Sequence, residues 1–330
     1  MELIQRLKIE IENLKNDKHF ANKRRKYIRQ SKNALIFLLR MVILIGICYV
    51  ILGPVIGIIS NSFFSDSDFA NKLVYIIPQN PTLERYRLSW LRLDYVKTLA
   101  NSLAYVLSLM VIQVVVCSMV GYGFARFDFP LKKLLFGMVI VMIIIPTHTV
   151  ILPIYVTFQE FDPFGIFSLL TGKVNNYLGS VKPMFIMTLL GSGLRSGLYI
   201  YIFNQFFRGL PKEIEEAAFV DGAGMWYTYF RIMLVNAIPS VLTVAIFSLV
   251  WQYNDTFFAN LFNINPNIVI SKKITTLQDT ISNVDKIMTP GISKLYLYSG
   301  IVLVILPIII VYVVLQKRFI EGVERSGIVG

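Results

Sequence analysis

The chain has 330 residues, of which 55% are hydrophobic and only 16% are charged, and its mean hydropathy is +0.62. These values exclude an ordinary soluble domain and place the chain among integral membrane proteins. The net charge of +12 does not indicate nucleic-acid binding, because most basic residues flank apolar runs, where anionic lipid headgroups suffice as partners.

The chain begins with a polar, basic segment, residues 1–33. Apolar residues recur in it every three or four positions: Leu3, Leu7, Ile11 and Leu14. This spacing predicts an amphipathic helix over residues 2–16, followed by a basic cluster between Lys23 and Arg29. We expect this helix to lie on the membrane surface, with docking to a partner subunit as the alternative. A cleaved signal peptide is not expected, because the run from Ala34 has the length of a retained span.

Residues 34–330 predict a single all-α membrane domain. Six apolar segments can cross about 30 Å of hydrocarbon, at residues 34–60, 100–124, 134–157, 184–207, 237–258 and 295–315. Segments on one side of these spans, including residues 1–33 and the tail 316–330, hold nineteen Lys and Arg residues, against eleven on the other side. We therefore expect both termini to be cytoplasmic.

The loop 208–238 is a polar, acidic interruption between two spans. Pro211 suits a first helical turn, and the glutamates that follow place negative charge at the positive end of the helix dipole. Ile214, Ala217 and Ala218 form one small apolar face, while Gly222 and Gly224 can supply the positive φ that ends a helix. The loop therefore predicts a helix of about three turns with a face suited to a partner; an ordinary surface helix is the alternative.

The sequence lacks the signatures of a catalytic chain. It contains no G-x-x-x-x-G-K-[ST] phosphate loop, and its two histidines, His19 and His148, lie far apart in sequence. Cys48 and Cys117 both fall inside predicted spans, which argues against a disulfide or a metal site. We therefore expect a non-catalytic subunit that binds no cofactor or metal ion.

The motif Glu216-Ala217-Ala218, followed after three residues by Gly222 and after nine more by Ile232 and Leu234, resembles the EAA loop of ABC importer permeases. The family's closing proline is Val235 here. Other parts resemble the carbohydrate-uptake subgroup, similar to the smaller maltose permease: Ile77-Pro78, Pro81-Thr82-Leu83, Asn101-Ser102, Ala125-Arg126-Phe127, Ile145-Pro146, Trp251-Gln252 with Asn254-Asp255, and Gln316-Lys317-Arg318-Phe319. The tail, Ser326–Gly330, lacks the lysine that often occurs there in the family.

This resemblance implies a type I ABC importer permease fold in a bacterial plasma membrane. The implied partners are a second permease in a heterodimer, two ATPase subunits that bind ATP and Mg²⁺, an extracytoplasmic solute-binding protein, a sugar and membrane lipid. The long external loop 259–294 is expected to meet the binding protein. The residues expected to couple to the ATPase are Glu213, Glu215, Glu216, Ala217, Ala218, Asp221 and Gly222.

Polar and aromatic residues inside the predicted spans are candidates for the translocation pathway. Polar groups in hydrocarbon are costly and tend to face protein or a water-filled cavity, and sugars need amides, carboxylates and aromatic faces. The candidates are Gln113, Tyr122, Arg195, Trp251, Gln252, Asn254 and Asp255. Interhelical hydrogen bonding and interfacial anchoring are the alternatives for each of them.

The sequence thus predicts the permease subunit of an ATP-driven, binding-protein-dependent importer, for a sugar or oligosaccharide, that works by alternating access. Pro146, Pro153 and the stretch Gly191-Ser192-Gly193 are expected to break helices or to pack closely, as a changing pathway requires. The alternatives are an ABC importer for another solute, an ion-coupled secondary transporter, and a receptor or scaffold protein.

Overall fold

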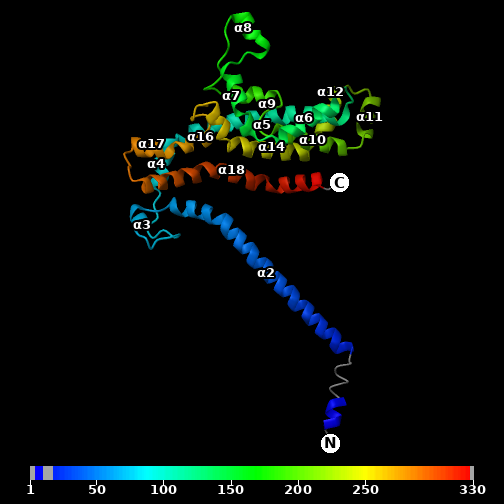
Figure 1. Ribbon diagram of the computed structural model, residues 1–330, viewed down its shortest axis with the longest axis vertical. Coiled ribbons are helices and arrows are strands. Elements are labelled where there is room, and N and C mark those ends of the chain that lie inside the picture. Colours follow the sequence, from blue (N-terminus) through cyan, green and yellow to red (C-terminus); the bar gives the residue numbers. More distant parts are fainter. Residues whose placement is uncertain (1–3, 10–17, 328–330) are drawn as a thin grey trace. The chain divides into compact units, whose positions relative to one another are not determined.

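The structure, a computed structural model, describes residues 4–9 and 18–327 (Figure 1). These residues are helical apart from turns and loops, and the one β contact among them is an isolated bridge between Phe161 and Asn175. The chain divides into two compact units, Met1–Asn61 with Tyr75–Ile77, and Ser62–Val74 with Pro78–Gly330.

The first unit is dominated by helix α2 (Lys18–Asn61). Its part Lys26–Asn61 is long and apolar enough to cross a membrane, which agrees with the span predicted at 34–60. None of the most apolar window of this helix is buried within its own unit. Residues 4–9 are helical, whereas Leu3, Ile11 and Leu14 of the predicted amphipathic helix lie outside the described residues.

The second unit is built around helix α5 (Tyr95–Arg126). This helix packs along α10 (Ser196–Gly209) and α14 (Ile238–Tyr253), and α14 packs in turn on α18 (Pro290–Gly327), so that the long helices lie side by side (Figure 1). The shorter helices are α3 (Asp66–Ala70), α4 (Glu84–Leu93), η2 (Pro163–Gly165), α8 (Ile166–Thr171), α12 (Met225–Tyr227) and α13 (Leu234–Asn236).

The contact between α5 and α10 depends on a glycine. A Cβ atom built on Gly121 would lie 2.6 Å from the Cβ of Phe203 and 3.0 Å from the backbone nitrogen of Asn204. The side chain of Asn204 donates a hydrogen bond of 3.3 Å to the Gly121 carbonyl. The two backbones therefore approach as closely as helices that meet at small residues in membranes.

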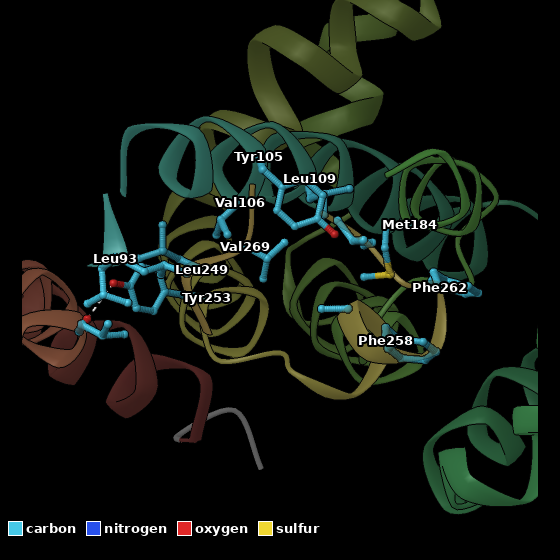
Figure 2. Close-up of a cluster of buried hydrophobic side chains, with 14 of the residues drawn as sticks. Leu93, Tyr105, Val106, Leu109, Met184, Leu249, Tyr253, Phe258, Phe262 and Val269 are labelled. Atoms are coloured by element: carbon cyan, nitrogen blue, oxygen red, sulfur yellow. Dashed lines mark hydrogen bonds between the residues drawn. The ribbon is translucent and has the colours of Figure 1, made fainter. Parts of the chain in front are cut away.

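A hydrophobic cluster lies where α5 and α14 meet α9 (Lys182–Leu189) and the segment after α14 (Figure 2). Tyr105 and Leu109 come from α5, Met184 from α9, and Phe258 and Phe262 from the following segment. That segment was predicted as the long loop 259–294. It contains α15 (Phe257–Leu261), α16 (Ile270–Thr275) and α17 (Leu277–Val284) and contributes apolar side chains to this cluster, while its contact with a binding protein stays a prediction.

Two of the predicted spans are interrupted. The third is divided into α6 (Lys132–Ile144), η1 (Thr147–Val150) and α7 (Ile151–Gln159), with a bend of 104°. Pro146 lies at this bend, where its missing N–H and its ring prevent a continuous helix. The fourth, 184–207, consists of α9 and α10, separated by a non-helical stretch that contains Gly191-Ser192-Gly193, where the sequence predicted a break or close packing.

Three of the described helices are long and apolar enough to cross a membrane, and five crossings result if each of two bent pairs counts as one. The second bent pair joins Met225–Asn236 to Ile238–Tyr253 at 78°. A sixth crossing formed by α9 and α10 stays a prediction.

Candidate coupling loop and membrane cavity

Helix α11 (Glu213–Val220) is the helix that the sequence predicted in the loop 208–238. It has eight residues, slightly more than two turns rather than three. Gly222 has φ +82°, and the N–H of Ala223 donates to the Ala218 carbonyl at 2.9 Å, which closes the helix in a Schellman motif. Gly224 has φ −71°, so it does not supply the positive φ that was expected of it.

The two faces of α11 have different environments. Glu215 and Ala218 are buried within the chain, and Ile214 packs on a hydrophobic cluster with Phe207 and Tyr229. The small apolar face predicted to receive a partner therefore points mainly into the chain itself. The outer face consists of the exposed residues Glu213, Glu216, Ala217, Phe219, Val220 and Asp221. It is acidic at its beginning and apolar near its end.

An ion pair ties α11 to the end of α5. The Arg126 Nε lies 3.3 Å from the Glu215 Oε2, and both side chains are almost fully buried. The Arg126 Nη2 also donates a 2.8 Å hydrogen bond to the carbonyl of Leu210, just before α11. Removing one partner of such a pair leaves a buried charge uncompensated, at a cost of about 3 to 5 kcal/mol. The position of α11 is therefore fixed relative to α5.

Aromatic side chains fill the space beside this ion pair. The Tyr122 ring lies 5.3 Å from that of Phe207 and 5.1 Å from that of Tyr229, measured between centroids. Tyr229 belongs to the π-helical segment η3 (Thr228–Met233), and its hydroxyl lies 2.6 Å from that of Ser118 on α5. Tyr122, predicted for the translocation pathway, is thus part of the support for the loop. No sequence signal pointed to the Ser118 contact, because a serine in a span has many potential partners.

A cavity of about 810 Å³ opens beside the two helix interruptions. Its wall comes from α6, the bend at Pro146, α7, the end of α9 and the stretch 192–198. Most lining side chains are aliphatic, and the polar ones are Thr147, His148, Thr157, Ser192, Arg195 and Ser196. Of the seven predicted pathway residues, only Arg195 lines this cavity.

Gln113 and Gln252 contact each other and do not reach the cavity. The Gln113 Oε1 accepts hydrogen bonds from Ser248 at 2.7 Å and from Gln252 at 3.0 Å, both on α14. The Gln113 Nε2 donates to the Leu194 carbonyl at 2.7 Å and to the Ser196 Oγ at 3.0 Å. These bonds connect α5, α14 and the start of α10, which is the interhelical role that the sequence left open as an alternative.

The other three pathway candidates lie at the end of α14. Trp251 is exposed, and its ring lies 4.4 Å from the Arg195 guanidinium carbon. The Asn254 side chain donates to the Val250 carbonyl at 2.9 Å, and Asp255 accepts a hydrogen bond from the Phe258 N–H at 3.2 Å. Asp255 therefore helps to begin α15.

Comparison with known proteins identifies the family. Residues 113–325 match the family described as binding-protein-dependent transport system inner membrane component. The chain belongs to this family. The predicted resemblance is thereby confirmed, and the protein is a multi-pass membrane permease rather than a soluble protein.

Curated permeases cover most of the chain. The diacetylchitobiose uptake system permease protein NgcG of Streptomyces coelicolor is 26% identical over 283 residues, 84% of each chain. The arabinooligosaccharides transport system permease protein AraQ of Bacillus subtilis is 28% identical over 240 residues, 72% of this chain and 74% of that one. A crystal structure of a bacterial ABC transporter involved in the import of the acidic polysaccharide alginate superposes with a TM-score of 0.64, over 87% of this chain and 98% of that chain. At 19% identity this likeness shows the fold alone.

Proposed function

We propose that this permease imports a sugar or an oligosaccharide, as one half of a two-permease pathway. Two ATPase subunits hydrolyse ATP and bind its Mg²⁺, one of them docks on α11, and an extracytoplasmic solute-binding protein delivers the sugar. The observation that carries the sugar assignment is that NgcG and AraQ, permeases for diacetylchitobiose and arabinooligosaccharides, cover most of this chain. In this proposal both termini and the loop 208–238 are cytoplasmic, as the distribution of Lys and Arg favours.

The two faces of α11 support its assignment as the coupling helix. Its inner face is held by the Arg126–Glu215 ion pair, and its outer face presents Glu216, Ala217 and Phe219 to whatever approaches. A partner that displaces the outer face must therefore displace the end of α5 as well. Such a rigid connection lets closure of an ATPase dimer be transmitted to the spans.

The helix interruptions support a pathway that changes shape. The bend at Pro146 and the stretch between α9 and α10 both border the cavity. Interrupted helices in membrane proteins occur where backbone is buried in protein or lines a water-filled cavity. In the proposed cycle these segments move when α11 is displaced, so that the cavity opens alternately to the two sides.

Uptake by the complete complex in lipid vesicles tests this function. We expect ATP-dependent uptake of a labelled oligosaccharide in the presence of the binding protein, and no comparable uptake of amino acids. Uptake of a non-sugar solute alone would contradict the sugar assignment. Uptake that follows an ion gradient without ATP would contradict the ABC mechanism and favour the secondary transporter.

Two substitutions test whether α11 is the coupling helix. Glu216→Lys reverses an exposed charge in the first turn, and Gly222→Val places a side chain at φ +82°, which costs on the order of 1 kcal/mol and redirects the chain after α11. Both variants should insert normally and lose most ATP-driven uptake. Gly224→Val is the matched control, because a Cβ at either glycine would meet no atom within 4 Å and only Gly222 has a positive φ. Normal uptake by both Glu216→Lys and Gly222→Val would refute the assignment.

A further inference from the structure

The guanidinium of Arg195 has no charged partner within the part of the chain that the structure describes. The four ion pairs found there involve other residues, and no described residue accepts a hydrogen bond from the Arg195 side chain. Its side chain contacts the Trp251 ring, whose centroid lies 4.4 Å from the guanidinium carbon. An unpaired arginine between two segments of a membrane helix is costly, and such residues mark pathways or binding sites.

The backbone holds Arg195 at the edge of the cavity in a defined conformation. Arg195 has φ +61° and directly precedes α10. The residues on either side of it, Leu194 and Ser196, both accept hydrogen bonds from the Gln113 side-chain nitrogen, at 2.7 and 3.0 Å. A left-handed backbone is unfavourable for arginine and persists only where surrounding contacts fix it. Gln113 is thus a positioning residue for Arg195.

The lining of the cavity is suited to an anion. Arg195 contributes a permanent positive charge, and none of the residues that line the cavity is an aspartate or a glutamate. The Thr157 and Ser192 hydroxyls donate to the Pro153 and Met187 carbonyls and can still accept hydrogen bonds from a sugar, and Thr147 adds a third hydroxyl to the lining. The Arg195 side chain is exposed on the described chain, so its guanidinium is accessible to a ligand, and its attraction for an opposite charge is strongest where a bound sugar excludes water.

The contact with Trp251 leaves the binding capacity of Arg195 intact. A cation over an aromatic ring is attracted to the ring's negative face, but the ring carbons accept no conventional hydrogen bond. The five N–H donors of the guanidinium therefore stay available, in a planar arrangement that matches the two oxygens of a carboxylate. Trp251 restrains the side chain and so reduces the entropy lost on binding.

We propose that the transported sugar carries a carboxylate, as a uronic acid does, and that Arg195 binds this carboxylate through two N–H donors while the sugar occupies the cavity. This inference rests on the proposed function, because it names the class of sugar that the same pathway accepts. It assigns Arg195 a role in specificity and leaves energy coupling to α11.

A matched pair of substrates tests the proposal in vesicles that contain the complete transport complex. The substrates are uronic acid oligosaccharides of two to four residues and their counterparts in which each carboxyl group has been reduced to an alcohol. Uptake is compared for the wild type, Arg195→Gln and Arg195→Lys. One binding protein serves all the permeases, so a change in the ratio of acidic to neutral uptake is a property of the permease. Arg87→Gln, at an exposed arginine of α4 outside the cavity, is the control.

We expect the wild type to import the acidic oligosaccharides, and Arg195→Gln to lower that uptake by about ten- to hundredfold, the factor expected for charge-assisted hydrogen bonds. Arg195→Lys should retain part of the uptake of the acidic oligosaccharides, because lysine keeps the positive charge but lacks the planar arrangement of N–H donors. The neutral counterparts and the Arg87→Gln control should change less than about twofold.

Three outcomes would overturn the proposal while the sugar function stands. The first is import of the neutral oligosaccharides alone. The second is a ratio of acidic to neutral uptake in Arg195→Gln equal to that of the wild type. The third is that Arg195→Gln loses the uptake of both substrates equally or fails to assemble. The last outcome would mean that Arg195 pairs with a carboxylate of another subunit. Import of a non-sugar solute and of neither oligosaccharide would instead refute the proposed function itself.

Discussion

Helix α5 contacts its neighbours by different chemistry at its end and at its middle. At its end, Arg126 forms a buried ion pair with Glu215, beside closely packed aromatic rings. At its middle, Gln113 makes neutral hydrogen bonds to α14 and to the start of α10. Both regions contain buried polar atoms without a hydrogen-bond partner among the described residues, Arg126 Nε and Glu215 Oε1 in the first and Gln252 Oε1 in the second.

The difference shows how one helix can be rigidly connected to α11 at its end and loosely connected to α14 and α10 at its middle. Breaking a buried ion pair costs about 3 to 5 kcal/mol, whereas interhelical hydrogen bonds in a membrane average about 0.6 kcal/mol. The end of α5 therefore moves together with α11 as one body, while the helix interruption beside Gln113 can rearrange at low cost. This is the distribution of rigidity that the proposed coupling of α11 to the cavity requires.

The largest expected effect comes from breaking the ion pair at the end of α5. Arg126→Gln leaves the Glu215 carboxylate buried without its cation and removes the hydrogen bond to the Leu210 carbonyl. We expect a loss of about 3 to 5 kcal/mol in the stability of the loop. Thermal melting of the purified permease complex and ATP-driven uptake should both fall sharply.

A double variant separates the charge from the packing. Arg126→Gln combined with Glu215→Gln removes both buried charges and should recover much of the melting temperature, because no uncompensated charge is left. Glu216→Gln, at an exposed position on the same helix, should melt like the wild type. If Arg126→Gln alone also melts like the wild type, the ion pair does not fix α11.

The next largest effect is expected at Gly121, which lies between the two regions of α5 and where α5 contacts α10 closely. In Gly121→Val the new Cβ would lie 2.6 Å from the Phe203 Cβ and 3.0 Å from backbone atoms of α10, which cannot move aside as a flexible side chain can. We expect a loss of about 1 to 3 kcal/mol from overpacking. Gly123→Val, two residues along the same helix, meets no atom within 4 Å and is the control. Equal melting temperatures for the two variants would show that α5 and α10 are not in close contact.

Local signals made helix α11 predictable, whereas its contacts with other helices were not predictable. Pro211, the glutamates and Gly222 define the ends of α11, because capping depends on residues near in sequence. The sequence could not indicate that Glu215 faces inward, since three glutamates in one turn do not show which of them meets Arg126. The placement of the partner decides this, and the partner comes from another helix.

The same dependence on tertiary contacts explains why most of the predicted pathway residues do not line the cavity. Tyr122 was chosen because aromatic rings suit sugars, yet its ring packs with Phe207 and Tyr229 near α11. The apolar run at 184–207 reads as one span, because hydropathy counts residues and does not register the left-handed backbone at Arg195. Gly191 and its neighbours indicated a break, but the cavity beside it depends on how α6 and α7 bend.

The smallest expected effect comes from the middle of α5. Gln113→Leu removes the bonds to the Leu194 carbonyl and to Ser248, at a cost of about 0.6 to 1.7 kcal/mol, so the complex should still assemble and melt only slightly lower. Arg195 would lose the contacts that fix its backbone, and the KM for the transported sugar should rise while the maximal ATPase rate stays nearly unchanged. Gln113→Leu with Gln252→Leu should recover only part of the loss in melting temperature, because the unpaired Gln252 amide is removed while the Leu194 carbonyl and the Ser248 hydroxyl still lack their partner, and the KM should not recover. A KM equal to that of the wild type in Gln113→Leu would show that Arg195 is positioned by other contacts, and the contrast drawn between the two regions of α5 would then not extend to the cavity.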